Sequence, residues 1–234
     1  MFIFIVFLLI ICLNCKSHYR GGFNIEKNPK LVNEYSEKAC NYGNINSCTD
    51  IGYAYYTGEG NLTKDRAKAI KYLKIASKGG VVWSYLLLAE IYDDKNASKE
   101  DNKLSKIFYD KSIDLYTRLA KSGKKLSSFD TLFELLLVNN RKLDKSLERD
   151  YLEIYKRENK SLIVYDMLKV FENIYNGKES NLDKWKEKYI KSKLLKKKRF
   201  RFTLLERWIE KVENKKIKKE LLEALKVFKS TLSQ

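Results

Sequence analysis

The sequence predicts an all-α fold, an α-solenoid in which antiparallel helix pairs stack one on the next. Three observations predict it. Strong helix formers such as Lys, Leu, Glu and Ala dominate the chain after Pro29, which is its only proline. Apolar residues recur at helical spacing, and a pattern of small and aromatic residues repeats along the chain at a shift of 37 residues.

The first 13 residues, Met1 to Leu13, are apolar throughout. A helix that crosses a bilayer needs about 20 such residues, so this run predicts a secretory signal peptide over residues 1–14. Cys15 follows at the place where a bacterial lipoprotein signal ends in a lipidated cysteine, and the segment resembles a lipobox. We therefore expect an exported protein held in the bacterial cell envelope by a lipid on Cys15. Cleaved secretion and an uncleaved membrane anchor are the alternatives.

Residues 15–28 are predicted to be a polar tether, after which only Cys40 and Cys48 remain as cysteines. An even pair of cysteines in an exported protein indicates a disulfide. Two reduced, partly buried thiols are the alternative.

The repeat starts with an amphipathic helix. Cys48, Ile51, Gly52 and Tyr55 fall at i, i+3, i+4 and i+7, which is one helical face. A second face follows the next loop, on Ala69, Tyr72, Leu73 and Ala76. The small residues at these positions let two helix backbones approach closely.

These residues resemble a Sel1-like repeat, a relative of the tetratricopeptide repeats with a longer loop between its helices. The matching positions are Gly52, Tyr55, Gly58, Gly60, Asp65, Ala69, Tyr72, Ala76 and Gly79. The resemblance implies a right-handed superhelix that binds another protein. The two cysteines are similar to those of a cysteine-rich bacterial branch, which implies a bridge between successive repeats.

The loop AYYTGEGNLTKD within this repeat places Gly58, Gly60 and Lys64 close together. Neither the P-loop spacing nor the dinucleotide-binding spacing is met, and the loop follows a helix rather than a strand. We therefore predict a turn: the two glycines end one helix and Asp65 caps the next.

The resemblance weakens along the chain, so we expect a repeat region over residues 29–125 and degenerate helical repeats over 126–234. The last two predicted helices, Phe202 to Val212 and Ile217 to Leu232, are amphipathic and are expected to cap the stack.

The only histidine, His18, lies in the tether. A serine or cysteine nucleophile therefore has no histidine base within the fold, and no histidine metal ligand is available there. Ser122 and Lys125 match the Ser-x-x-Lys element of penicillin-binding enzymes, an activity linked to some cysteine-rich members of the resembled family, but the accompanying elements are absent. We expect no enzyme, no cofactor and no metal. A penicillin-binding enzyme is the weakest alternative.

The net charge of +17 is concentrated near the end of the chain, because residues 181–234 hold 18 Lys/Arg and 7 Asp/Glu. The densest part includes the candidate binding residues Lys196, Lys197, Lys198, Arg199 and Arg201. Such a cluster suits an anionic membrane surface or an acidic partner, and export argues against nucleic acid. A solvated lysine-rich face is the alternative.

Tyr53, Tyr56 and Trp83 are the candidate contacts for a protein partner, with burial in the core as the alternative for each. The sequence as a whole predicts a lipid-anchored scaffold that mediates protein–protein interaction. An envelope-binding protein acting through the basic C-terminal helices is the second hypothesis.

Overall fold

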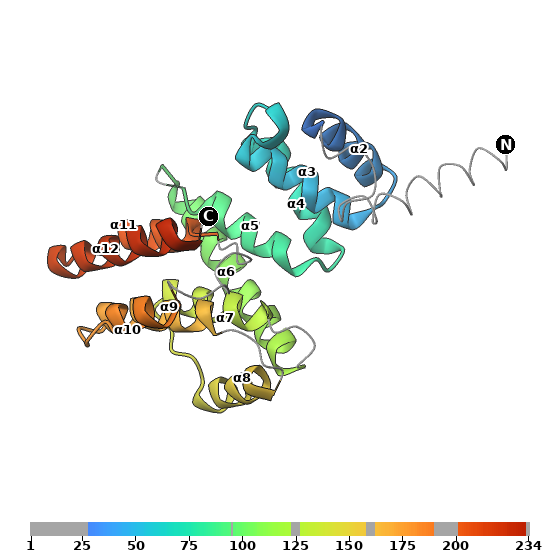
Figure 1. The fold of residues 1–234 in the computed structure, drawn as a ribbon. Helices are drawn as coiled ribbons and strands as arrows, with labels where there is room; N and C mark the ends of the chain where they lie inside the picture. Colours follow the sequence, from blue (N-terminus) through green and yellow to red (C-terminus); the bar gives the residue numbers. More distant parts are fainter. Residues whose placement is uncertain (1–27, 95, 123–126, 158–161, 190–200, 233–234) are drawn as a thin grey trace, which may run out of the picture. The chain divides into compact units, whose positions relative to one another are not determined.

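The computed structural model describes residues 28–94, 96–122, 127–157, 162–189 and 201–232. Throughout these ranges the secondary structure is helical and contains no strand, so the predicted all-α class is confirmed (Figure 1). None of the helices in these ranges has the length and apolarity that crossing a membrane requires. The predicted signal peptide and Cys15 lie outside the described residues.

The chain divides into two units, Met1–Ser112 and Ile113–Gln234, which are described separately below. The division falls within the long helix α6 (Lys99–Lys121).

The helices of unit 1 pack in chain order. They are α2 (Pro29–Asn41), α3 (Ile45–Thr57), the short 3-10 helix η2 (Glu59–Asn61), α4 (Arg66–Lys78) and α5 (Val82–Tyr92). Each long helix contacts the next one, and α3 also contacts α5. This serial packing of antiparallel helices is the stacking that a helical repeat requires.

Helix α3 and helix α4 approach each other closely at Gly52. A Cβ atom placed on Gly52 would lie 2.8 Å from Cγ of Leu73, a side chain that is fully buried. Around this contact, Ala69 and Ala76 of α4 are also fully buried. Small residues therefore set the distance between the two helix axes, as the repeat pattern predicts.

The loop after α3 is a turn, as predicted. Gly58 has a φ of 79° and ends the helix by donating its N–H to the carbonyl of Ala54 at 2.8 Å. Gly60 also has a positive φ, and a Cβ there would lie 2.3 Å from Nδ2 of Asn33 on α2. The Asn33 amide donates to the carbonyl of Glu59 at 2.9 Å. The loop is thus held from outside by α2.

The predicted cap at Asp65 is also present, since its Oδ1 accepts from the backbone N–H of Lys68 at 2.9 Å. A helix N-terminus has free amide hydrogens that a side-chain oxygen satisfies in this way. Gly79, at the other end of α4, leaves room for Ile45, because a Cβ there would lie 2.4 Å from its Cγ2.

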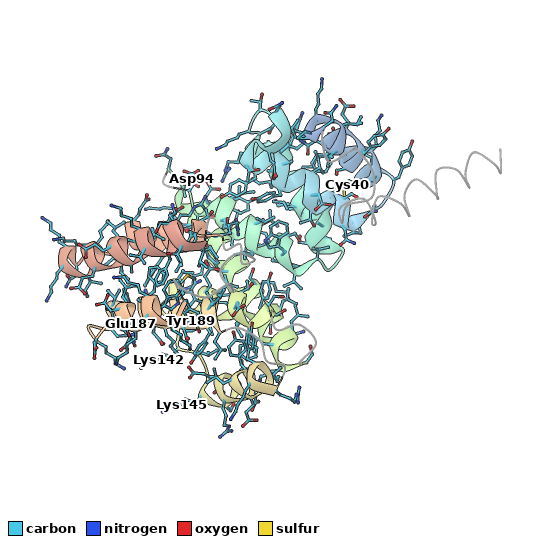
Figure 2. The ribbon with its side chains drawn as sticks, viewed as in Figure 1. Cys40, Asp94, Lys142, Lys145, Glu187 and Tyr189 are labelled. Atoms are coloured by element: carbon cyan, nitrogen blue, oxygen red, sulfur yellow. A yellow bond between two sulfur atoms is a disulfide. The ribbon has the colours of Figure 1, made fainter. Side chains whose placement is uncertain are left out.

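Two further links join α2 to the repeat. Cys40 and Cys48 form the predicted disulfide between α2 and α3 (Figure 2 labels Cys40). Glu37 accepts hydrogen bonds from Tyr72 at 2.6 Å and from Tyr55 at 3.3 Å. Burial, together with the Glu37 carboxylate, raises the pKa of Tyr72 well above its usual range. We call this arrangement the Glu37 bridge; it connects α2, α3 and α4.

Within its described residues, unit 2 contains the rest of α6 and six further helices. They are α7 (Ser127–Val138), α8 (Lys145–Arg157), α9 (Ile163–Tyr175), α10 (Leu182–Tyr189), α11 (Thr203–Glu210) and α12 (Lys215–Leu232). The two predicted C-terminal helices are therefore present as α11 and α12. Their packing is not purely serial, because α12 lies against α9 and α11 lies against α7.

Aromatic side chains explain the return of α12 to α9. Phe228 of α12 is fully buried, with ring centroids 5.3 Å from Phe171 and 4.6 Å from Trp185. Unit 2 also joins consecutive helices by tyrosine–carboxylate hydrogen bonds. Tyr151 of α8 donates to Asp130 of α7 at 2.6 Å.

We predict that Gly52→Ala destabilises unit 1 by about 1–2 kcal/mol. Overpacking against the fully buried Leu73 costs about 1–3 kcal/mol, and the better helix propensity of alanine offsets up to about 1 kcal/mol of this. Hydrogen exchange of the α3 amides measures the loss. In a Leu73→Ala background the obstructing side chain is absent, so Gly52→Ala should there be neutral or stabilising. An equal cost in both backgrounds would contradict the close-approach explanation.

Candidate functional site

An aromatic pair lies where α3 and α5 contact each other. The ring of Tyr53 on α3 and the ring of Trp83 on α5 have centroids 5.2 Å apart and planes tilted by 40°. Both side chains are half-buried: they pack against the core and also keep exposed area. We call these two residues the aromatic pair.

Helical geometry explains why Tyr53 is only partly buried. Successive residues turn by about 100° around a helix, so Tyr53 lies on the side of α3 opposite Ile51 and Tyr55, which are buried. Trp83 stands in the first turn of α5, ahead of the fully buried Leu87 and Leu88. The same pattern that buries the core faces of both helices therefore leaves part of each ring exposed, on a side of α3 and α5 that we call the outer face.

The structure brings together two of the three predicted aromatic contacts. Tyr56, the third, is half-buried and packs against the core cluster that contains Cys48 and Ile51. All three residues pack against the core and also keep exposed area, so both interpretations of them remain predictions.

Asp50 shares the outer face of α3 with Tyr53, because residues three apart in a helix are neighbours. Burial raises the pKa of Asp50 to about 6. The carboxylate has no hydrogen-bond or ion-pair partner within the described part of the chain. A buried carboxylate without a partner costs stability. Carboxylates whose pKa is raised in this way are more frequent at functional sites than elsewhere.

Thr49, the residue before Asp50, carries a second unpaired polar group. Its hydroxyl is buried and has no hydrogen-bond partner among the described residues. An unsatisfied buried hydroxyl costs about 1–3 kcal/mol. Two neighbouring polar groups on α3 are therefore unpaired beside the aromatic pair.

Asp50 is not among the site residues predicted from the sequence, although the residues around it give a reason to consider it. No lysine or arginine stands three or four residues away from it on either side, in a chain with 47 such residues. Helical carboxylates are commonly paired at that spacing. Asp50 has no lysine or arginine at this spacing on an amphipathic helix, so it could have been named as a candidate functional residue.

The other predicted site residues do not form a second site in the described part of the chain. The repeat residues from Gly52 to Gly79 have the packing, turn and capping positions given above. Ser122 donates its hydroxyl to the carbonyl of Leu119 at 2.7 Å, whereas Lys125 lies outside the described residues. Lys196, Lys197, Lys198 and Arg199 also lie outside them, and Arg201 is half-buried. The described residues contain no group of side chains suited to hold a metal ion.

Serially packed helices with a partly exposed aromatic pair define this part of the chain as a helical-repeat scaffold. The Sel1 repeat family model matches residues 45–81, from the first residue of α3 to the residue before α5. The predicted Sel1 repeat is thereby confirmed for this segment. Sel1 repeats generally mediate protein–protein interaction and are typically non-catalytic scaffolds. Searches of curated proteins and of solved structures found no match.

We predict that Asp50→Asn stabilises unit 1 at pH 7 but not at pH 4. The pKa of Asp50 is raised in the folded state, so its contribution is most favourable below the unfolded value near 4 and is lost as the pH rises through about 6. Asparagine does not ionise, so the variant keeps this stability. After a discount for partial exposure we expect a gain of about 1–2 kcal/mol at pH 7.

Hydrogen exchange of α3 at the two pH values measures this difference. Equal protection of the variant and the wild type at pH 7 would show that the folded structure does not penalise the Asp50 carboxylate.

Proposed function

We propose that this chain is a non-catalytic scaffold that binds another protein on the outer face of α3 and α5, and that it is exported and lipid-anchored in the bacterial cell envelope. The aromatic pair is the observation that supports the binding role most directly. Tyrosine and tryptophan are the residues most enriched among the energetic centres of protein interfaces.

The support beneath the aromatic pair favours binding. The disulfide, the Glu37 bridge and the Gly52 contact all hold α3 in place from its inner side. A surface that is already ordered loses less conformational entropy when a partner binds, which improves affinity. The two rings therefore form a preorganised contact area on a rigid helix pair.

Asp50 adds a charge preference to this surface. Its carboxylate has no partner in the described part of the chain, so a lysine or arginine of the bound protein would gain a charge-assisted hydrogen bond there. Pairing would also remove the cost of the isolated charge. We expect the partner to place a basic side chain beside Tyr53.

The disulfide supports the proposal of export. Disulfides persist in oxidising compartments and are rare in the reducing cytosol. Together with the apolar run at residues 1–13 and the cysteine that follows it, the Cys40–Cys48 bridge favours a protein that works outside the cytoplasm.

We predict that Trp83→Ala reduces capture of the bound protein at least about tenfold, because loss of a central aromatic contact costs about 2 kcal/mol or more. The measurement is a pull-down, under oxidising conditions, from an extract of the cells that make this protein. Tyr42→Ala is the matched control, since Tyr42 is 72% exposed and stands at the C-terminal end of α2 rather than on α3 or α5. Capture that both variants retain, or both lose, would refute binding at this face.

We predict that Cys15→Ser abolishes the lipid anchor. In a bacterial host grown with labelled palmitate, the wild type should carry the label and remain in the membrane fraction, whereas the variant should lose both properties. Cys12→Ser is the control, because Cys12 lies within the segment predicted to be removed. Labelling that persists in Cys15→Ser would disprove lipidation at this residue.

A further inference from the structure

A cavity of about 260 Å³ lies between α9 and α10 in unit 2. Its α9 wall includes Asp166, Lys169 and Asn173, which stand on one face of that helix at i, i+3 and i+7. Its α10 wall includes Lys184, Trp185 and Lys188. Figure 2 labels Glu187 and Tyr189, two other residues of α10. We call this space the lysine cavity.

Two of the three lysines are held in place by carboxylates. Lys169 Nζ lies 2.7 Å from Glu148 and 2.8 Å from Glu172, and Lys188 Nζ lies 2.7 Å from Asp166. Burial alone would lower the pKa of each ammonium. The hydrogen bonds to these carboxylates have a larger, opposite effect, so the pKa values of both lysines lie above their usual range. Both lysines therefore stay charged, and their geometry is fixed before anything binds.

The ion pairs do not use every donor. An ammonium has three N–H groups. Lys169 uses two on its carboxylates, and its Nζ also lies over the rings of Phe133 and Tyr165. Lys188 uses one on Asp166 and also hydrogen-bonds to Tyr189, which leaves one N–H group for a ligand. Lys184 is exposed at the mouth of the cavity and has no hydrogen-bond or ion-pair partner among the described residues, and the side-chain amide of the half-buried Asn173 has none there either. The cavity thus presents several open donors from both walls around one space.

The charge balance determines which anion suits this space. The three lysines are offset by three carboxylates, Asp166 in the wall and Glu148 and Glu172 behind Lys169. A doubly charged phosphate would leave two uncompensated negative charges among partly buried groups, which is costly. A carboxylate adds only one negative charge and still accepts two or more hydrogen bonds.

We propose that the lysine cavity binds a carboxylate group, with Lys184 as its main donor and Lys169, Lys188 and Asn173 completing the contacts. A free small organic acid and an Asp or Glu side chain of a bound peptide supply the same group. This site is separate from the aromatic pair, so either proposal stands if the other fails.

Acetate is the first probe, titrated into the complete chain at constant ionic strength with chloride as the balancing anion. We expect saturable NMR shifts at the Trp185 indole and the Asn173 side-chain amide, both of which line the cavity. Lys184→Gln should weaken binding at least tenfold, whereas Lys184→Arg should retain it. Lys178→Gln is the matched control, an exposed lysine in the turn before α10 and outside the cavity lining.

A peptide, acetyl-Gly-Glu-Gly-amide, is the second probe. Tighter binding of the peptide than of acetate would support the site and assign it to a protein partner, and binding of acetate alone would support a small organic acid. Three results would overturn the proposal: shifts that do not saturate, equal weakening by Lys178→Gln and Lys184→Gln, or tighter binding of phosphate than of acetate at the same ionic strength.

Discussion

The contact between Gly52 and Leu73 is the constraint on which the rest of unit 1 depends. Because no side chain separates the two backbones there, α3 lies close enough to α4 for Tyr72 to reach Glu37 on α2. Tyr53, the next residue, is turned by about 100° around the helix from this contact and keeps exposed area. Packing of Gly52 in the core and partial exposure of Tyr53 are therefore two results of the same helix orientation.

Unit 2 keeps consecutive helices together by the type of interaction that the Glu37 bridge makes in unit 1. Hydrogen bonds from tyrosine hydroxyls to carboxylates join α7 to α8, α8 to α9 and α9 to α10, with Tyr151, Tyr165 and Tyr189 as the donors. Each bond satisfies a polar group that packing would otherwise leave unpaired in a partly apolar setting. A helix pair joined in this way does not need small residues at fixed positions.

The fold was predictable where a residue acts through its neighbours in the sequence. The cap at Asp65 and the turn at Gly58 are local, and both follow from residue type and spacing alone. Gly60 differs, because its position depends on Asn33, which lies 27 residues earlier. The turn at Gly60 is predictable from the local sequence, but the contact with Asn33 that holds it is not. The sequence identifies Tyr53 and Trp83 only as separate candidates, because their rings meet through the tertiary contact between α3 and α5. The lysine cavity was not predictable, since its walls meet only through the packing of α9 on α10.

Net charge is a poor guide to where this molecule binds charged groups. In a chain of net charge +17, the half-buried Asp50 of unit 1 has a pKa that is raised by burial. The lysines of unit 2 that line a cavity are matched by an equal number of carboxylates. What matters at each place is whether a charged group has a partner. Asp50 has none in the described residues, so a cation there gains most. Lys184 has none there either, and the carboxylates already paired with Lys169 and Lys188 favour a singly charged anion at the site that we propose.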